Sequence, residues 1–99
     1  MKKILVAENG LDTRMNWENA NYACSKLGNG WRLPTQDELK AMYEQLHQNG
    51  KGSFQTAFYW SSIEIGYNNK YARFVSFNGG DSHYFRKDAT YYVQAVQTI

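Results

Sequence analysis

The stretch GNGWRLPTQDEL, residues 28–39, carries the strongest local structural signals in the chain. Thr35 and Glu38 match the capping box T-x-x-E, in which the threonine hydroxyl and the glutamate side chain each satisfy a free backbone N–H at a helix start. Pro34, the only proline, restricts the chain just before that start. The stretch therefore predicts the beginning of a helix, and leaves open whether Trp31 and Arg32 belong to a catalytic loop or to a structural corner.

Apolar residues recur at helical spacing on both sides of this stretch. Before it, a helix from Trp17 to Leu27 is expected, with Asn16 as its N-cap and Gly28 as its end. The apolar stripe of this first helix is Trp17, Ala20, Ala23, Cys24 and Leu27. The second helix has the stripe Leu39, Met42, Tyr43 and Leu46, and it ends at QNGKG, residues 48–52.

The second half of the chain has the alternating, aromatic and β-branched texture of strands. Strands are predicted at residues 57–63, 70–77, 82–87 and 91–97, and Asn78-Gly79 predicts a hairpin with a type I′ turn. We read these as an antiparallel meander, with a further short strand at residues 4–7 and a turn at LDTRMN, residues 11–16.

Length and element order together predict one α+β domain over residues 1–99. A chain of 99 residues supports a single core, and two helices followed by a sheet place one sheet face on the helices. Trp17, Trp31 and Trp60 are the expected fillers of that buried layer.

Charge and composition exclude several partners. The net charge of +2 comes from 11 basic and 9 acidic residues without a basic run, so nucleic acid is not expected. The apolar start at residues 4–7 is too short for an export signal or membrane anchor, which favours a cytoplasmic or virion-associated protein without membrane insertion. Cys24, the only cysteine, is expected to be buried and inert.

Four segments in order resemble a known family. They are NWENANYACSKLGNGWRLPTQDEL (16–39), YWSSIE (59–64), YARFVSFNGG (71–80) and YYVQAVQ (91–97). Together they resemble the C-terminal domain family of the Legionella collagen-like protein, over about residues 11–97. That family is a branch of the C-type-lectin-like superfamily, which includes variable proteins of diversity-generating retroelements and formylglycine-generating enzymes. The resemblance implies two helices, a twisted, mostly antiparallel sheet, paired termini, and a ligand surface on the sheet and its loops.

The resemblance also implies an answer to the opening question. Residues 31–38 would form the corner between the helices, with Arg32 held against carboxylates and Trp31 packed beneath. The chain departs from the family where a second cysteine commonly pairs with the one in the first helix, because Ala95 stands there. Gln94 and Gln97 replace arginines, and Arg73 stands where an aromatic residue is usual.

Catalytic chemistry finds no support in the sequence, so we expect no enzyme and no cofactor. One cysteine cannot supply the cysteine pair of a formylglycine-generating enzyme, and His47 and His83 lack metal-ligand spacing. Ser61 and Ser62 lie in a predicted strand without the G-x-S-x-G elbow of a nucleophile. The calcium loops of sugar-binding C-type lectins, E-P-N or Q-P-D, are also absent, so any ligand is expected to bind without calcium.

The expected ligand surface lies in EIGYNNKYAR (64–73) and NGGDSHYFRK (78–87). These segments are rich in tyrosine, asparagine, serine, histidine and arginine, which give rigid amphipathic anchors and adaptable hydrogen bonds in binding surfaces. Because strand residues alternate between faces, the candidates are expected to divide between the two sides of the sheet. The candidate residues are Tyr67, Asn68, Asn69, Tyr71, Arg73, Ser82, His83, Tyr84, Arg86 and Tyr91.

These observations favour a non-enzymatic binding module for a protein or carbohydrate ligand. The alternative is a structural or assembly protein of a phage or surface complex that forms homo-oligomers through the same face. A further hypothesis is that the surface is diversified by a retroelement, because residues such as those of DSHY (81–84) are reachable by randomising adenines in an asparagine codon. Loops are rich in these residues in any case, and the sequence names neither the ligand nor the assembly.

Overall fold

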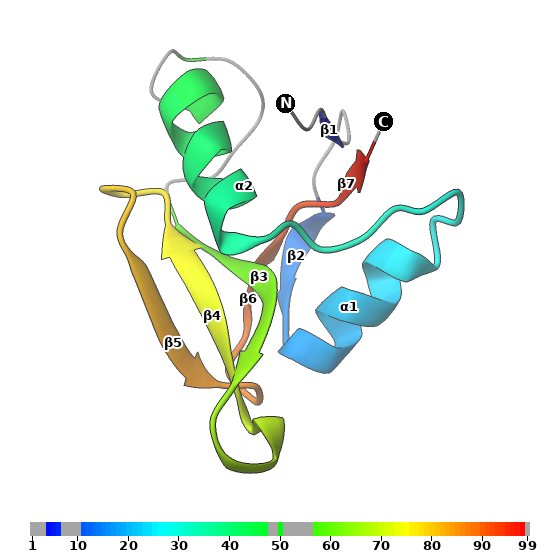
Figure 1. The fold of residues 1–99 in the computed structure, drawn as a ribbon, viewed down its shortest axis with the longest axis vertical. Coiled ribbons are helices and arrows are strands. Elements are labelled where there is room, and N and C mark those ends of the chain that lie inside the picture. Colours follow the sequence, from blue (N-terminus) through cyan, green and yellow to red (C-terminus); the bar gives the residue numbers. More distant parts are fainter. Residues whose placement is uncertain (1–3, 7–10, 48–49, 51–56, 99) are drawn as a thin grey trace.

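The computed structural model describes residues 4–6, 11–47, 50 and 57–98, and it shows an α+β domain with two helices and a mixed sheet (Figure 1). The helices are α1 (Trp17–Ser25) and α2 (Gln36–Met42), which continues into a π-helical turn (Tyr43–His47). The strands are β1 (Ile4–Val6), β2 (Leu11–Met15), β3 (Phe58–Ile65), β4 (Tyr71–Ser76), β5 (Ser82–Arg86), β6 (Tyr91–Val93) and β7 (Val96–Thr98), and a 3₁₀ turn (Tyr67–Asn69) precedes β4.

The main sheet has the strand order β2-β6-β3-β4-β5. β3, β4 and β5 form the expected antiparallel meander, but β6 returns to lie parallel to β3, with Tyr92 beside Tyr59. The mostly antiparallel sheet implied by the family resemblance is confirmed, but the predicted meander ends at β5 and does not extend to the last strand. Alternation along a strand indicates which face is buried and not the direction of its neighbour. β1 pairs with β7, so the paired termini are confirmed (Figure 1).

Two local expectations are also corrected. Residues 11–15 form strand β2 and not a turn, because their backbone pairs with β6, with Leu11 opposite Val93 and Met15 opposite Tyr91. The segment alternates the uncharged Leu11, Thr13 and Met15 with the charged Asp12 and Arg14, a strand pattern that the interpretation as a turn overlooked.

The β4–β5 hairpin is confirmed, but its turn is not type I′. Positive φ falls on Gly79 (145°) and Gly80 (83°) and not on Asn78. The Ser76 N–H bonds to the Asp81 carbonyl, and the Gly80 N–H bonds to the Ser76 carbonyl, so the loop is wider than a two-residue turn. Gly80 also lies against the Tyr43 ring, where an added Cβ would come within 2.8 Å of it, so contact with the helical segment shapes this loop.

The two helices pack on opposite faces of the sheet. Trp60 and Tyr59 are neighbours on β3, and alternation sends their side chains to different faces. Trp60 belongs to a buried cluster with residues of α1, namely Trp17, Ala20 and Cys24. Tyr59 belongs to a second cluster with Leu39 and Met42 of α2, together with Val75, Phe77 and Val96.

The predicted helix starts are confirmed. The Asn16 side chain accepts a hydrogen bond from the Asn19 N–H at the start of α1. This helix ends at Ser25, so Leu27 lies beyond it and is half exposed, contrary to its expected place in the buried stripe. In α2 the capping box of Thr35 and Glu38 is complete. Leu39 and Met42 are buried as expected, whereas the side chain of Leu46 and most of QNGKG lie outside the described residues.

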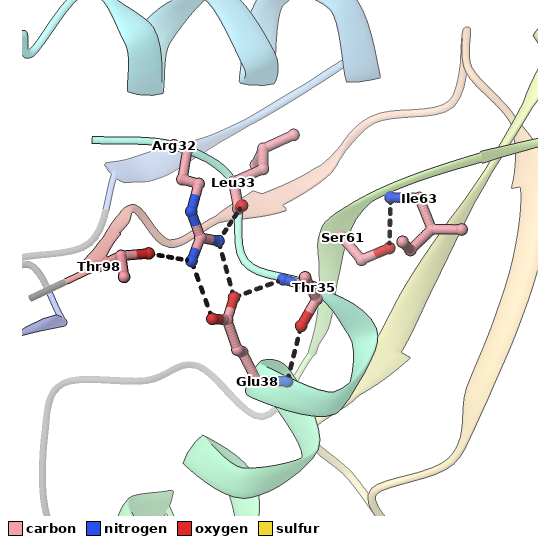
Figure 2. A network of polar contacts seen from close by, with 7 residues as sticks. All are labelled: Arg32, Leu33, Thr35, Glu38, Ser61, Ile63 and Thr98. Carbon is pink, nitrogen blue, oxygen red and sulfur yellow. Dashed lines mark hydrogen bonds and ion pairs between the residues drawn. The ribbon is translucent and has the colours of Figure 1, made fainter. Parts of the chain in front are cut away.

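The corner between the helices is held by the guanidinium of Arg32 (Figure 2). Its two terminal nitrogens donate to the two Glu38 carboxylate oxygens at 2.8 and 2.9 Å, and also to the Leu33 carbonyl and to the Thr98 hydroxyl of β7. The backbones of Arg32 and Val96 bond to each other in both directions. Glu38 also accepts from the Thr35 N–H at 2.8 Å. Residues 31–38 therefore form a structural corner, and the half-buried Trp31 packs against the α1 cluster as expected.

The indole groups of the other two tryptophans, which are buried, connect distant elements. The Trp17 Nε1–H donates to the Ser61 carbonyl, and the Trp60 Nε1–H donates to the Met15 carbonyl.

Neither α1 nor α2 is long and apolar enough to cross a membrane, and the same holds for every helix in the described part of the chain.

We expect Glu38→Gln to lower the free energy of unfolding by about 1–3 kcal/mol, because it replaces a charge-assisted bidentate contact by a weaker amide contact. Urea denaturation followed by tryptophan fluorescence measures the change. Asp37→Asn is the matched control: Asp37 is exposed in the same helical turn, so its change should stay within about 0.5 kcal/mol. Equal effects of the two substitutions would show that the Arg32 contact does not stabilise the corner.

Burial raises the pKa of the Cys24 thiol from its ordinary value of 9.0 to about 12. The folded protein should therefore resist thiol-modifying reagents at pH 8 and react fully once unfolded in urea. Between about pH 9 and pH 12 the unfolded thiol loses its proton while the folded one keeps it, so this group makes folding less favourable as the pH rises. Cys24→Ala should lose that part of the pH dependence, and rapid labelling of the native protein would contradict the assignment.

Candidate functional site

The β4–β5 pair carries most of the residues predicted to bind a ligand, and alternation separates them onto two faces. Tyr71 is opposite Arg86, and Arg73 is opposite Tyr84, so these four side chains share one face. We call them the tyrosine–arginine face. Ser82, opposite Val75, lies on the same side of the sheet, nearer to α2.

The tyrosine–arginine face is open to solvent. α2 covers this side of the sheet only at Tyr59, Val75 and Phe77, where the second core cluster lies. Beyond it Tyr84 is 57% exposed, Arg86 is exposed, and Tyr71 and Arg73 are half-buried. The rings of Tyr71 and Tyr84 meet edge to face, with centroids 5.9 Å apart, which fixes the orientation of both.

A hollow of about 620 Å³ adjoins this face. Both the hollow and the tyrosine–arginine face include Tyr71 and Arg86, so the hollow and the face form one continuous surface. The hollow is lined by Asn16, Glu18, Glu64, Asn69, Lys70, Tyr71, Arg86, Lys87 and Asp88.

Lys87 holds the wall of the hollow in place. Its ammonium lies 2.6 Å from Glu64 Oε2 and 4.3 Å from the centroid of the Trp17 ring, and its backbone carbonyl accepts from the Trp17 N–H at 3.0 Å. The start of α1 is thereby fixed to the end of β5, although the two are far apart in sequence. Because the ammonium is paired and shielded by the indole, Lys87 supports the wall and leaves the exposed Arg86 as the more accessible cation.

The loop before β4 forms another side of the hollow. Gly66 has a φ of 89° and its Cα lies against the Tyr71 ring, where an added Cβ would come within 2.5 Å of Cδ2. Asn69, with a φ of 54°, lines the hollow, and Tyr67 at the tip is 83% exposed. The side chain of Asn68 lies outside the described residues. Thus the loop brings Asn69 to the site and leaves Tyr67 projecting beside it.

His83 and Tyr91 do not belong to this surface. His83 is opposite Phe74, and both side chains lie on the α1 side of the sheet, with ring centroids 5.8 Å apart. Tyr91 packs on Phe74 at 4.6 Å and on Trp60 at 4.7 Å, and burial raises the pKa of its phenol. Tyr91 also borders a smaller hollow of about 360 Å³, lined by Arg14, Ala57, Phe58, Asn78, Thr90, Tyr91 and Tyr92. The structure therefore divides the seven candidates that lie on strands between two faces, as alternation leads one to expect.

Several residues of the surface were missed at the level of sequence. Three of them, Glu64, Lys70 and Lys87, lie within the predicted ligand segments 64–73 and 78–87. Neither their charge nor their spacing in the sequence distinguishes them from ordinary solvent-exposed residues. Asn16 and Glu18 are far away in the sequence, and the contacts of Trp17 with Lys87 and Ser61 bring them to the hollow. No local pattern signals those contacts.

The fold defines the class of this protein as a small α+β domain with paired termini and an open sheet face. The family model of the Lcl C-terminal domain matches residues 4–97, and the chain belongs to this family. The resemblance seen in the four sequence segments is thus confirmed. No curated protein matches the chain.

The contact between Gly66 and Tyr71 can be tested with Gly66→Ala. Gly28→Ala is the matched control, because Gly28 has a similar φ of 74° but open space where its Cβ would lie. Gly28→Ala should lose about 1–2 kcal/mol of unfolding free energy from its positive φ. Gly66→Ala should lose about 1–3 kcal/mol from the backbone alone, because its φ of 89° and ψ of 176° lie in a region that almost only glycine adopts. Gly66→Ala should lose at least about 1 kcal/mol more, since the Cβ displaces the Tyr71 ring.

In a Tyr71→Ala background the excess of Gly66→Ala over Gly28→Ala should shrink by at least about 1 kcal/mol, because the ring is gone and only the backbone penalty is left. Urea denaturation of the six proteins measures the whole set. An excess that is unchanged without Tyr71 would show that the ring does not rest on Gly66.

Proposed function

We propose that this domain is a non-enzymatic, calcium-independent ligand-binding module that presents the tyrosine–arginine face and its adjoining hollow to a protein or glycan target. The observation that carries the proposal is the continuity of the two features: cross-strand pairs of tyrosine and arginine run along β4 and β5 and lead directly into a hollow lined by polar side chains. Tyrosine and arginine are enriched where few residues supply most of the binding energy. The lectin-like relationship implied by the family resemblance is part of this proposal.

The charge of the hollow favours a neutral, hydrogen-bonding ligand. Lys70, Arg86 and Lys87 are balanced by Glu18, Glu64 and Asp88. Within it Lys87 pairs with Glu64, and Arg86 Nε lies 3.5 Å from Asp88. A polyanion would meet as many repulsive as attractive groups here, whereas sugar hydroxyls or peptide amides can bond to either sign.

The same ion pairs support calcium-independent binding. Ca²⁺ takes six to eight oxygen ligands, usually with several carboxylates. The carboxylates of Glu64 and Asp88 each face a basic side chain, and the described residues contain no group of three or more histidine, cysteine, aspartate or glutamate side chains able to hold a metal ion. A ligand would therefore be bound directly by aromatic faces and hydrogen bonds.

The placement of the nucleophilic side chains supports a non-enzymatic role. Ser61 is fully buried and its hydroxyl donates to the Arg73 carbonyl. Cys24 is buried with a raised pKa, and His83 lies on the opposite side of the sheet from the tyrosine–arginine face. None of the three lines the hollow.

Glycan and protein arrays probed with the labelled domain test the proposal. We expect a specific ligand whose affinity falls at least about tenfold in Tyr84→Ala and in Arg73→Ala, because each removes an anchor of the face. Tyr22→Ala is the matched control, since Tyr22 is an exposed tyrosine on α1, and it should bind like the wild type. Binding should also survive a calcium chelator.

Arg14→Ala separates the two hollows. Arg14 borders the smaller hollow and not the larger one, so its substitution should leave binding unchanged. Binding that survives Tyr84→Ala and Arg73→Ala but is lost in Arg14→Ala would refute the placement of the ligand surface.

A further inference from the structure

Strand β5 is the last strand of the main sheet on its side. It pairs with β4 alone, and no described element lies beyond it (Figure 1). Sheet edges of this kind offer a row of unpaired backbone groups to another strand. The β5 edge therefore presents a second surface, distinct from the tyrosine–arginine face.

The register shows which backbone groups point outward. At one end of the ladder the Lys87 N–H bonds to the Lys70 carbonyl, and at the other end the Ser76 N–H bonds to the Asp81 carbonyl. Hydrogen-bonded and non-bonded pairs alternate along an antiparallel ladder. His83 and Phe85 are thus bonded to β4, while Ser82, Tyr84 and Arg86 direct their N–H and C=O groups away from it. Of these outward groups, the Arg86 carbonyl already accepts from the Ala89 N–H.

This edge has few of the features that block strand pairing. Proteins protect edges with proline, bulges or inward-pointing charges. β5 reads SHYFR, contains no proline, and keeps an unbroken register with β4. Its one charged side chain, Arg86, starts on the tyrosine–arginine face, but its guanidinium lies 5.6 Å from the centroid of the Phe85 ring, which belongs to the other face. This flexible side chain therefore crosses the edge, and it has to turn aside when another strand pairs with β5.

We propose that β5 pairs with β5 of a second copy of this chain, antiparallel and centred on Tyr84. Only this register pairs the whole strand: Ser82 meets Arg86 of the second copy, His83 meets Phe85, and Tyr84 meets Tyr84. Tyr84 N–H and C=O exchange bonds across the two-fold axis, and each Arg86 N–H donates to a Ser82 carbonyl. About four backbone hydrogen bonds form without disturbing an existing one.

The side chains around this pairing are self-complementary. Aromatic residues face each other on both sides of the sheet, as Tyr84 with Tyr84 and as His83 with the half-exposed Phe85. Arg86 lies diagonally beside Tyr84 of the second copy, where a cation can contact the ring face. These features favour a second copy over an unrelated strand.

The pairing joins two tyrosine–arginine faces into one surface, because residues opposite each other in a ladder lie on the same side of the sheet. The inference does not rest on the proposed function, since an edge can pair whether or not the face binds a ligand. The pairing is weak, because a five-residue strand buries less area than the roughly 1,000 Å² of a stable interface.

Sedimentation analysis of the full chain from about 10 µM to about 1 mM tests the pairing. The mass should rise with concentration from 11.5 kDa towards twice that value. Tyr84→Pro removes only an outward N–H, which an edge strand tolerates, and should abolish the rise. Tyr84→Thr keeps the N–H and should still associate. A chain that stays monomeric throughout, or a folded Tyr84→Pro variant that associates like the wild type, would overturn the proposal.

Cysteine cross-linking tests the register and remains informative if Tyr84→Pro fails to fold. In a Cys24→Ala background, a mixture of His83→Cys and Phe85→Cys chains should oxidise to a heterodimer, because these positions face each other in a non-bonded pair with Cα atoms about 4.5 Å apart. Each variant alone should cross-link poorly. Equal cross-linking of His83→Cys with itself, or no cross-linking of the mixture, would refute the pairing centred on Tyr84.

Discussion

The bidentate contact between Arg32 and Glu38 holds the corner between the two helices, against which the sheet with the proposed ligand surface is built. One guanidinium joins the corner, the N-terminus of α2 and the last strand, through Glu38, the Leu33 carbonyl and Thr98. Hydrogen bonding to Glu38 raises the pKa of Arg32, so the guanidinium keeps its charge even at high pH. The corner then bonds to β3, because the Ser62 N–H donates to the Pro34 carbonyl. With one cysteine the chain forms no internal disulfide, so polar contacts and packing hold these elements together.

The buried cluster beside α1 is held without a covalent link. Cys24 and Ala95, the two positions at which the family resemblance implies a disulfide, belong to this cluster. The methyl group of Ala95 and the protonated thiol of Cys24 are both buried there. The indole N–H groups of two tryptophans bond to the backbone of β3 and β2 on this side of the sheet. The same α1 helix begins at the wall of the hollow, so packing of the core and shape of the site depend on each other.

The parts of this structure that the sequence predicts are those controlled by local contacts. The N-cap at Asn16, the capping box at Thr35 and the buried positions of α2 follow from neighbours within one turn, and each is confirmed. Strand alternation likewise separates Tyr84 from His83. What could not be predicted depends on partners far away in the sequence. β6 lies parallel to β3, the Gly79-Gly80 turn adapts to the ring of Tyr43, and contacts between Trp17 and Lys87 bring the start of α1 to the hollow.

The alternation of β5 gives its residues two independent ways to make contact. Ser82, Tyr84 and Arg86 place their side chains on the tyrosine–arginine face and direct their backbone groups to the sheet edge. A ligand on the face and a strand at the edge therefore use different atoms of the same residues, and neither contact blocks the other. A dimer paired through β5 presents two tyrosine–arginine faces, and the pairing alters neither face. A target with repeated units, such as a glycan chain, gains most from this arrangement, because the second contact then forms at a high local concentration.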